Sequence, residues 1–401
     1  AALELVVASG RGGGAGQLCF EQLALQVLGA PPATITPQLV HGPAGSVLSF
    51  GGALHEFNGL LWRWASPRHG PALVQASDDG RHWRTLHRLP PGQRRWQALW
   101  LPEQAARHVR ITGAARALDL VARTPADWPD RNALLSALAA QAPRSHHPRA
   151  LHGEQNYWTL VGVDGGGASA ALLSEDGAIE PHRGGPSIEP LVRDGQGRLL
   201  GWAEVQADGS RRTTLRDGHL PLPTVNWAHP AFGLAVEAGA EGSRSQAQLI
   251  ARYTLHNPRT VPQRLTLLLA LRPWQVNPPQ QFLNTPGGAA DVRQLAWQGR
   301  TLQVNGRPWL MALDAPAQVQ AAAFDAGDPL AGLAAPPARA PPHLPPLRDP
   351  QGLASAVLQW PVELAAGERR SITVSLPLAG SPVPPRDRSE EHTSELQSRY
   401  V

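Results

Sequence analysis

Residues Gln263–Pro273 read QRLTLLLALRP, a run whose apolar side chains occupy odd and even positions alike. Successive side chains of a strand point to opposite faces, so the run predicts a strand covered on both faces. Just before it, Ala247–Asn257 read AQLIARYTLHN, a second long strand pattern. Asn257–Pro262 separate the two runs and contain two prolines, which predicts a hairpin connection. Together these stretches predict a layered, all-β core.

The same type of pattern extends over the region from about Glu154 to Leu378. Asp-Gly pairs mark tight turns between its short apolar runs. Two further strand patterns, AVLQWPVEL and RSITVSLPL, close the region at its C-terminal end. The Pro-rich residues 331–350 are predicted to form a surface loop. The whole region therefore reads as antiparallel β-structure.

The preceding part of the chain, residues 3–121, also alternates short apolar runs with turn residues. The runs are LQVLG, SVLSF, GLLWRW, ALVQAS, WRTLHRL, WQALWL and HVRIT. Their spacing is typical of an antiparallel sandwich. Trp128–Ala142 predict one helix, with Asp130 as its N-cap and three leucines on one face. Pro143–Arg149 break this helix.

These patterns predict four segments. Residues 1–125 form a first β-sandwich, 126–150 a helix and linker, 151–380 a second β-region, and 381–401 a linker and tail. From Arg388 the tail reads RSEEHTSELQSR, which resembles a translated sequencing adapter. We therefore expect the tail to be artefactual and the natural protein to continue beyond Asp387.

Composition excludes several classes of protein. The chain has 401 residues with 40 Gly and 40 Pro, which argues against long helices. Its 36 basic residues are all Arg, and the net charge of +4 is spread along the chain without a basic cluster. We therefore expect no nucleic-acid partner. A single Cys rules out a disulfide framework, and no apolar run is long enough for a membrane span.

Residues from about Ser46 to Val121 resemble a discoidin module, the coagulation factor five/eight C-type domain. Ser77–Trp83 read SDDGRHW and Leu99–Thr112 read LWLPEQAARHVRIT, and these two motifs carry the resemblance. It implies a jelly-roll sandwich whose loops bind glycans.

Residues from about Pro148 to Leu378 resemble the β-supersandwich, a galactose-mutarotase-like fold, of bacterial six-hairpin glycosidase-like proteins. The motifs that carry this resemblance are GEQNYW (Gly153–Trp158), SIEP (Ser187–Pro190), LPLP (Leu220–Pro223) with Trp227, and LRPWQVNP (Leu271–Pro278). The resemblance implies a helical catalytic toroid that follows the β-region and holds the general acid and base. No catalytic residue can be assigned within this chain.

Tryptophan is the residue type that best suggests a ligand contact, since the thirteen Trp outnumber the three Tyr and six Phe combined. A flat indole can pack against a sugar ring while Arg and Asn donate hydrogen bonds to its hydroxyls. Trp62 and Trp64 share one face of a predicted strand. Other candidates lie in the supersandwich motifs and could line a groove: Trp158, Trp227, Arg272, Trp274 and Asn277. Core packing is the alternative role for the tryptophans.

Two carboxylates and a group of histidines complete the candidates. Glu154 and Glu189 have apolar or aromatic neighbours that could raise their pKa values, as a glycosidase pair needs. Binding Arg or backbone N–H groups is their alternative role. His146, His147 and His152 lack a metal-binding spacing, which predicts a solvated linker rather than a metal site. We expect no cofactor. The sequence contains no pattern that shows whether a structural calcium ion is bound.

The leading hypothesis is a noncatalytic, glycan-binding β-region of a larger bacterial glycoside-hydrolase-like protein, whose helical catalytic domain lies outside this chain. Its partners would be a polysaccharide and that helical domain. The Trp-rich surface and discoidin motif favour export to the periplasm or beyond. A cell-surface scaffold that binds protein or lipid, and a self-contained glycosidase using Glu154 and Glu189, are the alternatives.

Overall fold

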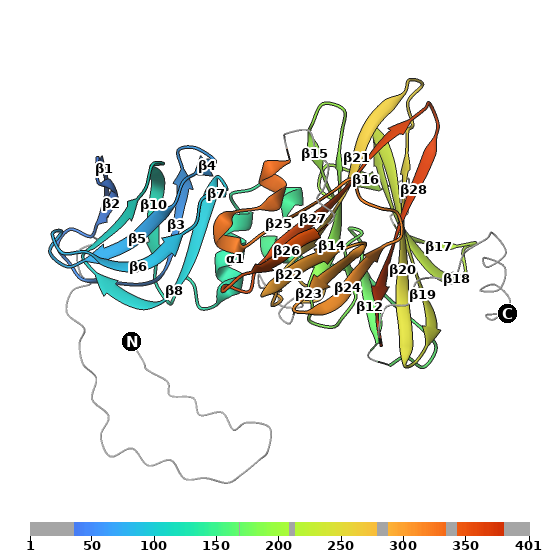
Figure 1. The fold of residues 1–401 in the computed structure, drawn as a ribbon, viewed down its shortest axis with the longest axis horizontal. Coiled ribbons are helices and arrows are strands. Elements are labelled where there is room, and N and C mark those ends of the chain that lie inside the picture. Colours follow the sequence, from blue (N-terminus) through green and yellow to red (C-terminus); the bar gives the residue numbers. More distant parts are fainter. Residues whose placement is uncertain (1–35, 168, 208–212, 279–287, 334–342, 381–401) are drawn as a thin grey trace, which may run out of the picture. The chain divides into compact units, whose positions relative to one another are not determined.

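The computed structural model describes residues 36–167, 169–207, 213–278, 288–333 and 343–380. The residues described from Pro37 onward belong to one compact unit. The LQVLG run and the tail from Arg388 lie outside the described residues. The described chain is an all-β protein built from antiparallel sheets, as the sequence predicts (Figure 1).

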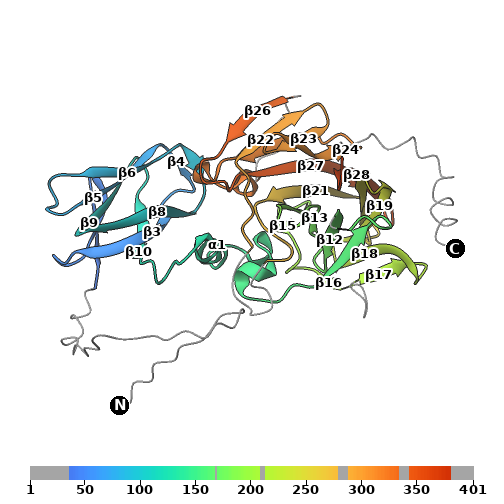
Figure 2. The ribbon, with the colours of Figure 1, turned by 90° about the horizontal axis from the view of Figure 1, so that it is seen from below.

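Residues 38–123 form a first sandwich of two facing sheets. One sheet has the strand order β1 (Gln38–Gly42), β2 (Gly45–Ser49), β9 (His108–Thr112), β5 (Ala72–Ser77) and β6 (Arg84–Leu89). The facing sheet has the order β10 (Ala117–Arg123), β3 (His55–Trp64) and β8 (Trp96–Ala106), and the short strands β4 (Arg68–His69) and β7 (Gly92–Gln93) pair beside them. Figure 2 shows the two sheets from below.

The core of the first sandwich lies between these sheets. Val74, Val109 and Ile111 meet Leu60 and Leu99 there, and all five are almost completely buried. Asp79 and Gly80 form the predicted turn after β5, with Gly80 at a φ of 71°. This positive φ suits a glycine, because a Cβ atom would strain the backbone.

Helix α1 (Arg131–Ala139) follows the first sandwich and is shorter than the predicted helix. The Asp130 side chain accepts hydrogen bonds from the backbone N–H groups of Asn132 and Ala133, which confirms it as the N-cap. The predicted apolar face, Leu134, Leu135 and Leu138, is buried against β8 and Trp128. The short 3-10 helices η1 (Arg144–His146) and η2 (Arg149–His152) then replace the predicted linker.

The described residues between 158 and 378 form a second sandwich of two larger sheets. The first of them, the β21 sheet, contains β11 (Trp158–Gly162), β12 (Ala170–Ser174), β13 (Ile179–Glu180), β14 (Ser187–Arg193), β21 (Gln263–Arg272), β27 (Ser355–Leu364) and β25 (Gln318–Ala322) in this order, with β15 (Leu199–Leu200) beside β14. The second, the β20 sheet, contains β16 (Gln206–Ala207), β18 (Leu220–His229), β19 (Phe232–Ser243), β20 (Gln246–His256), β28 (Arg369–Pro377), β24 (Arg307–Ala312), β23 (Thr301–Val304), β22 (Gln294–Gln298) and β26 (His343–Arg348), with β17 (Thr213–Arg216) beside β18.

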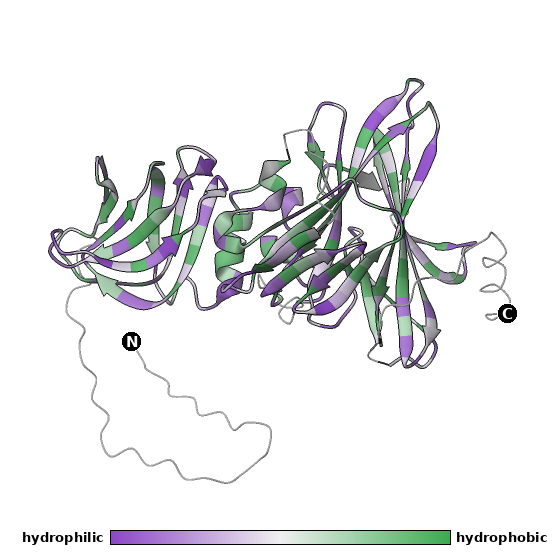
Figure 3. Cartoon of the chain, in the orientation of Figure 1, coloured by the Kyte–Doolittle hydropathy of each residue, from purple (hydrophilic) through white to green (hydrophobic). Residues whose placement is uncertain are grey.

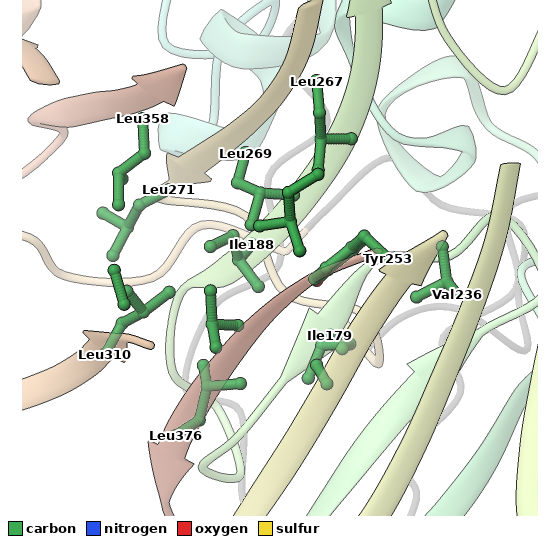
Figure 4. Close-up of a cluster of buried hydrophobic side chains, with 14 of the residues drawn as sticks. Ile179, Ile188, Val236, Tyr253, Leu267, Leu269, Leu271, Leu310, Leu358 and Leu376 are labelled. Carbon is green, nitrogen blue, oxygen red and sulfur yellow. The ribbon is translucent and has the colours of Figure 1, made fainter. Parts of the chain in front are cut away.

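Side-chain alternation places β21 between two apolar environments. Leu267, Leu269 and Leu271 point into the core between the two large sheets, where Figure 4 shows them near Ile188 and Tyr253. Leu268 and Ala270 point to the outer face, where Leu330 and Leu333 cover them. The prediction of a strand buried on both faces is therefore confirmed. Figure 3 shows that hydrophobic and hydrophilic residues are interspersed along the strands.

The predicted hairpin between the two long runs is wrong. β20 pairs with β19 and β28, whereas β21 pairs with β14 and β27, so Asn257–Pro262 carry the chain from one sheet to the other. The reason is that each strand pairs with two other strands within its own sheet. The predicted loop at 331–350 is also wrong in part, because His343–Arg348 form β26 and pair with β22.

Candidate functional site

The outer face of the β21 sheet carries polar side chains at the end where β14, β21 and β27 meet. Glu189 lies opposite Ala270 in the register of β14 and β21, and Ser187 lies opposite Arg272. Period-two alternation therefore places Glu189 and Arg272 on the face that bears Leu268, away from the core between the sheets. Arg272 is 1% exposed and Glu189 is 9% exposed.

A cavity of about 230 Å³ opens over this face. Three parts of the chain form its walls: residues 94–96 at the start of β8, residues 138–147 from the end of α1 to η1, and the segment of the 3-10 helices η4 (Phe324–Ala326) and η5 (Pro329–Gly332). Its lining combines aromatic and charged side chains, namely Arg94, Trp96, Arg272, Trp274, Phe324 and Asp328. This volume is large enough for several waters or for one sugar ring.

Arg272 is the central cation of this cavity. Its Nη2 donates a hydrogen bond to the carbonyl of His146 at 2.7 Å, and the same nitrogen lies 3.6 Å from a carboxylate oxygen of Asp328. Burial raises the pKa of Asp328, but the positive charges of Arg272 and Arg94 outweigh it, so this pKa lies below its usual value. Asp328 is therefore an anion at neutral pH.

Arg94 faces Arg272 from the first sandwich. Its Nη2 donates to the carbonyl of Gly327 at 3.1 Å, and its guanidinium lies 4.5 Å above the ring of Phe324. Burial lowers the pKa of Arg94, and Asp328 opposes this effect. A guanidinium stays protonated at any physiological pH, so Arg94 contributes a second fixed positive charge.

Glu189 lies on the same face of the sheet as Arg272, on the neighbouring strand β14. Burial raises the pKa of Glu189 to about 7, although the charge of Arg272 opposes the shift. Glu189 lines a separate small cavity of about 20 Å³ together with Asp176 and Trp202, which is room for a single water. Glu154, by contrast, is tied to the guanidinium groups of Arg144 and Arg149. The structure therefore gives the two candidate carboxylates different surroundings.

The tryptophan candidates fall into two groups. Trp62 and Trp64 lie inside the core of the first sandwich, and Trp227 lies between the large sheets, each at most 2% exposed. Their indole faces have no room for a ligand in this conformation. Trp274 is 5% exposed and lines the cavity, where its ring centroid lies 5.7 Å from that of His147.

Trp158 and Asn277 lie outside the cavity lining. Trp158 is 39% exposed on the edge strand β11, beside the exposed Tyr157 and Leu160. The side chain of Asn277 is exposed, while its backbone N–H donates to the buried carboxylate of Glu180 at 3.1 Å. Of the residues predicted from the sequence, Arg272 and Trp274 therefore line the cavity, and Glu189 lines the separate smaller cavity.

The prediction of a solvated histidine linker is wrong for two of its members. His147 is 8% exposed and His146 is partly buried, because the 3-10 turns press this segment against Trp274 and Arg272. Burial lowers the pKa of both imidazoles, and Arg272 lowers it further. Within the described ranges, no group of His, Cys, Asp or Glu is arranged to hold a metal ion.

Arg94, Trp96, Phe324 and Asp328 are cavity residues that sequence reasoning did not select. Arg94 and the Gly327 carbonyl that it contacts are 233 positions apart in the chain. No local pattern relates residues at such a separation. The Arg-Arg-Trp sequence at 94–96 was the available signal, since it places two cations beside an aromatic ring.

Comparisons with known proteins give no family assignment. No family model and no curated protein matches the chain. Among solved structures, a mutant of chitosan-binding module 1 from a chitosanase/glucanase of Paenibacillus sp. IK-5 is similar at 18% identity and a TM-score of 0.16, over 20% of this chain and 56% of that one. A putative kojibiose phosphorylase from the human microbiome is similar at 10% identity and a TM-score of 0.26, over 57% of this chain and 26% of that one. Both TM-scores are too low to support a functional inference. No helix of the described residues is long and apolar enough to cross a membrane.

Proposed function

We propose that this chain is a noncatalytic, carbohydrate-binding β-region, and that the cavity over the β21 sheet is its glycan site. The observation that carries the proposal is the composition of the cavity lining. Trp96, Trp274 and Phe324 offer apolar ring surface, while Arg94, Arg272 and Asp328 offer directed hydrogen bonds. A sugar ring presents this combination of an apolar C–H face and polar edges.

The carboxylates favour binding over hydrolysis. Glycoside hydrolysis uses two carboxyl groups held a few ångströms apart on either side of the bond. Among the described residues that line the cavity, Asp328 is the single carboxylate. Glu154 is held by two arginines and Glu189 lies in the small cavity, so neither supports the self-contained glycosidase.

The sequence resemblance supplies the wider setting of the proposal. In this setting residues 1–125 are a discoidin-like module, residues 151–380 a supersandwich, and the catalytic helical domain lies beyond the chain. The parent protein would be a bacterial glycoside-hydrolase-like protein that acts outside the cytoplasm. The gene's uninterrupted sequence tests this setting, because it should encode a helical repeat region downstream.

Binding of the full chain to an oligosaccharide array tests the glycan site. We expect retention of at least one glycan, and a loss of about tenfold or more in affinity in Trp96→Ala, because removing an aromatic platform costs well over 1 kcal/mol. Trp83→Ala is the matched control, since Trp83 is partly buried beneath Arg110 in the first sandwich and does not line the cavity. Failure to retain any glycan, or equal affinity in Trp96→Ala, would contradict the proposal.

The scaffold alternative is favoured by one observation of its own. Trp158 and Leu160 are exposed on one face of β11, an edge strand of its sheet, and the exposed Tyr157 precedes this strand. Such edges can pair with another chain. The double variant Trp158→Ser, Leu160→Ser distinguishes the two functions, because it should leave glycan binding at the cavity unchanged.

A further inference from the structure

We propose that the cavity selects acidic sugars, with a carboxylate or sulfate of the ligand held between Arg94 and Arg272. This inference rests on the proposed glycan site and narrows its ligand class. Its basis is an excess of hydrogen-bond donors over acceptors in the cavity lining, together with an excess of positive charge.

The donors are buried nitrogen atoms without acceptors. Arg272 Nη1, Arg94 Nη1 and Trp274 Nε1 are each inaccessible to solvent, and none has a hydrogen-bond partner in the described part of the chain. All three residues line the cavity. A buried donor left unpaired costs about 1–3 kcal/mol, more for a charged group, so these three atoms favour a ligand that brings hydrogen-bond acceptors.

The charges of the lining also favour an anionic ligand. In the described lining, Arg94, Arg95 and Arg272 carry positive charge and Asp328 carries the one negative charge. His146 and His147 contribute no charge at neutral pH, because burial lowers their pKa values. The cavity lining therefore has a net positive charge.

Asp325 and Asp349 lie just outside the lining and offset part of this charge, since both raise the pKa of Arg94. Asp325 is already paired with His87, whose Nε2 lies 2.8 Å from Asp325 Oδ2. Asp349 accepts three backbone N–H bonds, and burial raises its pKa. Burial likewise raises the pKa of Glu189 to about 7. Asp325 Oδ1 is an unpaired acceptor, but Asp325 does not line the cavity.

An oxyanion fits this lining better than a neutral hydroxyl does. Each hydroxyl that accepts a hydrogen bond also brings a proton that needs an acceptor of its own. A carboxylate or sulfate brings acceptors alone, and guanidinium groups bind such groups through paired N–H donors. Asp328 Oδ1 accepts from the backbone N–H of Leu330, and Oδ2 lies 3.6 Å from Arg272 Nη2 with a lone pair left to accept from a ligand hydroxyl. One acidic sugar would therefore use the arginines and the aspartate together.

Calorimetric titration of the full chain at low ionic strength tests the inference. The probes are short oligouronates and their carboxyl-reduced counterparts, which share linkage and ring shape and differ only in the acidic group. A sulfated oligosaccharide of the same length forms a further arm and separates carboxylate from sulfate recognition. We expect the acidic member of a pair to bind about tenfold tighter or more, the effect of hydrogen bonds to a charged group.

Three variants locate the effect. Arg94→Gln removes one guanidinium and should abolish the preference for the acidic member. Arg272→Lys keeps the positive charge but loses the forked donors and should weaken the preference. Arg264→Gln is the matched control, because Arg264 is 83% exposed and lies away from the cavity lining. Melting temperatures establish that each variant is folded.

The outcomes separate this inference from the proposed function. Equal affinity for an oligouronate and its reduced counterpart overturns the acidic specificity and leaves the glycan site standing. Absence of binding to both members of every pair overturns the glycan site as well. If folded Arg94→Gln keeps the full preference for the acidic sugar, the anionic group does not bind at Arg94. This result would overturn its placement in this cavity.

Discussion

Glu189 is a carboxyl group whose ionisation opposes folding. Its pKa rises from 4.5 in an exposed chain to about 7 in the folded protein, mainly through burial and against the charge of Arg272. The folded state therefore keeps its proton between these two pH values while the unfolded state loses it. Stability contributed by this group is complete below about pH 4.5 and is lost as the pH rises to 7.

Glu189→Gln should remove this pH dependence. We expect equal free energies of unfolding for variant and wild type near pH 4.5, and a variant more stable by up to about 3 kcal/mol at pH 8. Urea unfolding at both pH values measures the difference. Glu363→Gln is the control, because Glu363 is 74% exposed in its ion pair with Arg264. Parallel pH profiles for wild type and Glu189→Gln would show that Glu189 is not the group responsible.

The sequence located some site residues and missed others for a physical reason. Arg272 and Trp274 stand at the end of a recognisable buried strand, so their pattern could be seen. Arg94 and Asp328 meet through tertiary packing of segments that are far apart in the chain. Burial of Trp62 and Trp64 could not be told from exposure, because period-two alternation fixes a shared face and not which face is covered.

At the level of elements, Asn257 fixes the crossing from the β20 sheet to the β21 sheet. The residue is fully buried, and its Nδ2 donates to the carbonyls of Val261, Leu364 and Ala365 at 2.9–3.1 Å. The two Nδ2 hydrogens are shared among these three carbonyls, and Oδ1 accepts from the backbone N–H of Arg259 at 3.0 Å. The side chain thus joins the loop after β20 to the end of β27.

Asn257→Ala should destabilise the protein by about 2–4 kcal/mol, because it leaves several buried backbone groups without partners. Asn226→Ala is the matched comparison. Asn226 is partly buried and makes only long contacts of 3.3 and 3.5 Å, so we expect a loss below about 1 kcal/mol. Chemical denaturation monitored by tryptophan fluorescence measures both, and similar losses would contradict the role of Asn257.

Elements with strong local patterns were predictable, and connections between them were not. ALVQAS and HVRIT correspond to β5 and β9, and Asp130 caps α1. The crossing at Asn257–Pro262 looked like a hairpin because local sequence does not encode which sheet a strand joins. Residues 294–322 form β22 to β25, which the sequence analysis did not assign, and a register shift interrupts the pairing of β23 with β24. The predicted domain boundaries stay predictions.

For the whole molecule, the cavity depends on contacts between the first sandwich and the segment 324–333. Gln93 forms a parallel bridge with Gly327, and the backbone N–H of Asp328 donates to the Gln93 carbonyl at 3.3 Å. A Cβ atom at Gly92 would lie 2.3 Å from the carbonyl oxygen of Ala326, so the backbones touch at this point. The positions of Arg94 and Asp328 in the cavity follow from this contact.

Gly92→Ala should therefore push these two walls of the cavity apart. A contact with backbone cannot be relieved by a rotamer change, so we expect a destabilisation of about 1–3 kcal/mol, typical of overpacking. Hydrogen exchange at the Asp328 amide should become faster, and affinity for the glycan should fall about tenfold as Arg94 moves away from Arg272. Gly70→Ala is the matched control, because a Cβ atom there meets open space. If Gly92→Ala speeds exchange at Asp328 yet binds glycan with unchanged affinity, the ligand does not lie between these walls, and the glycan site must be sought on another surface.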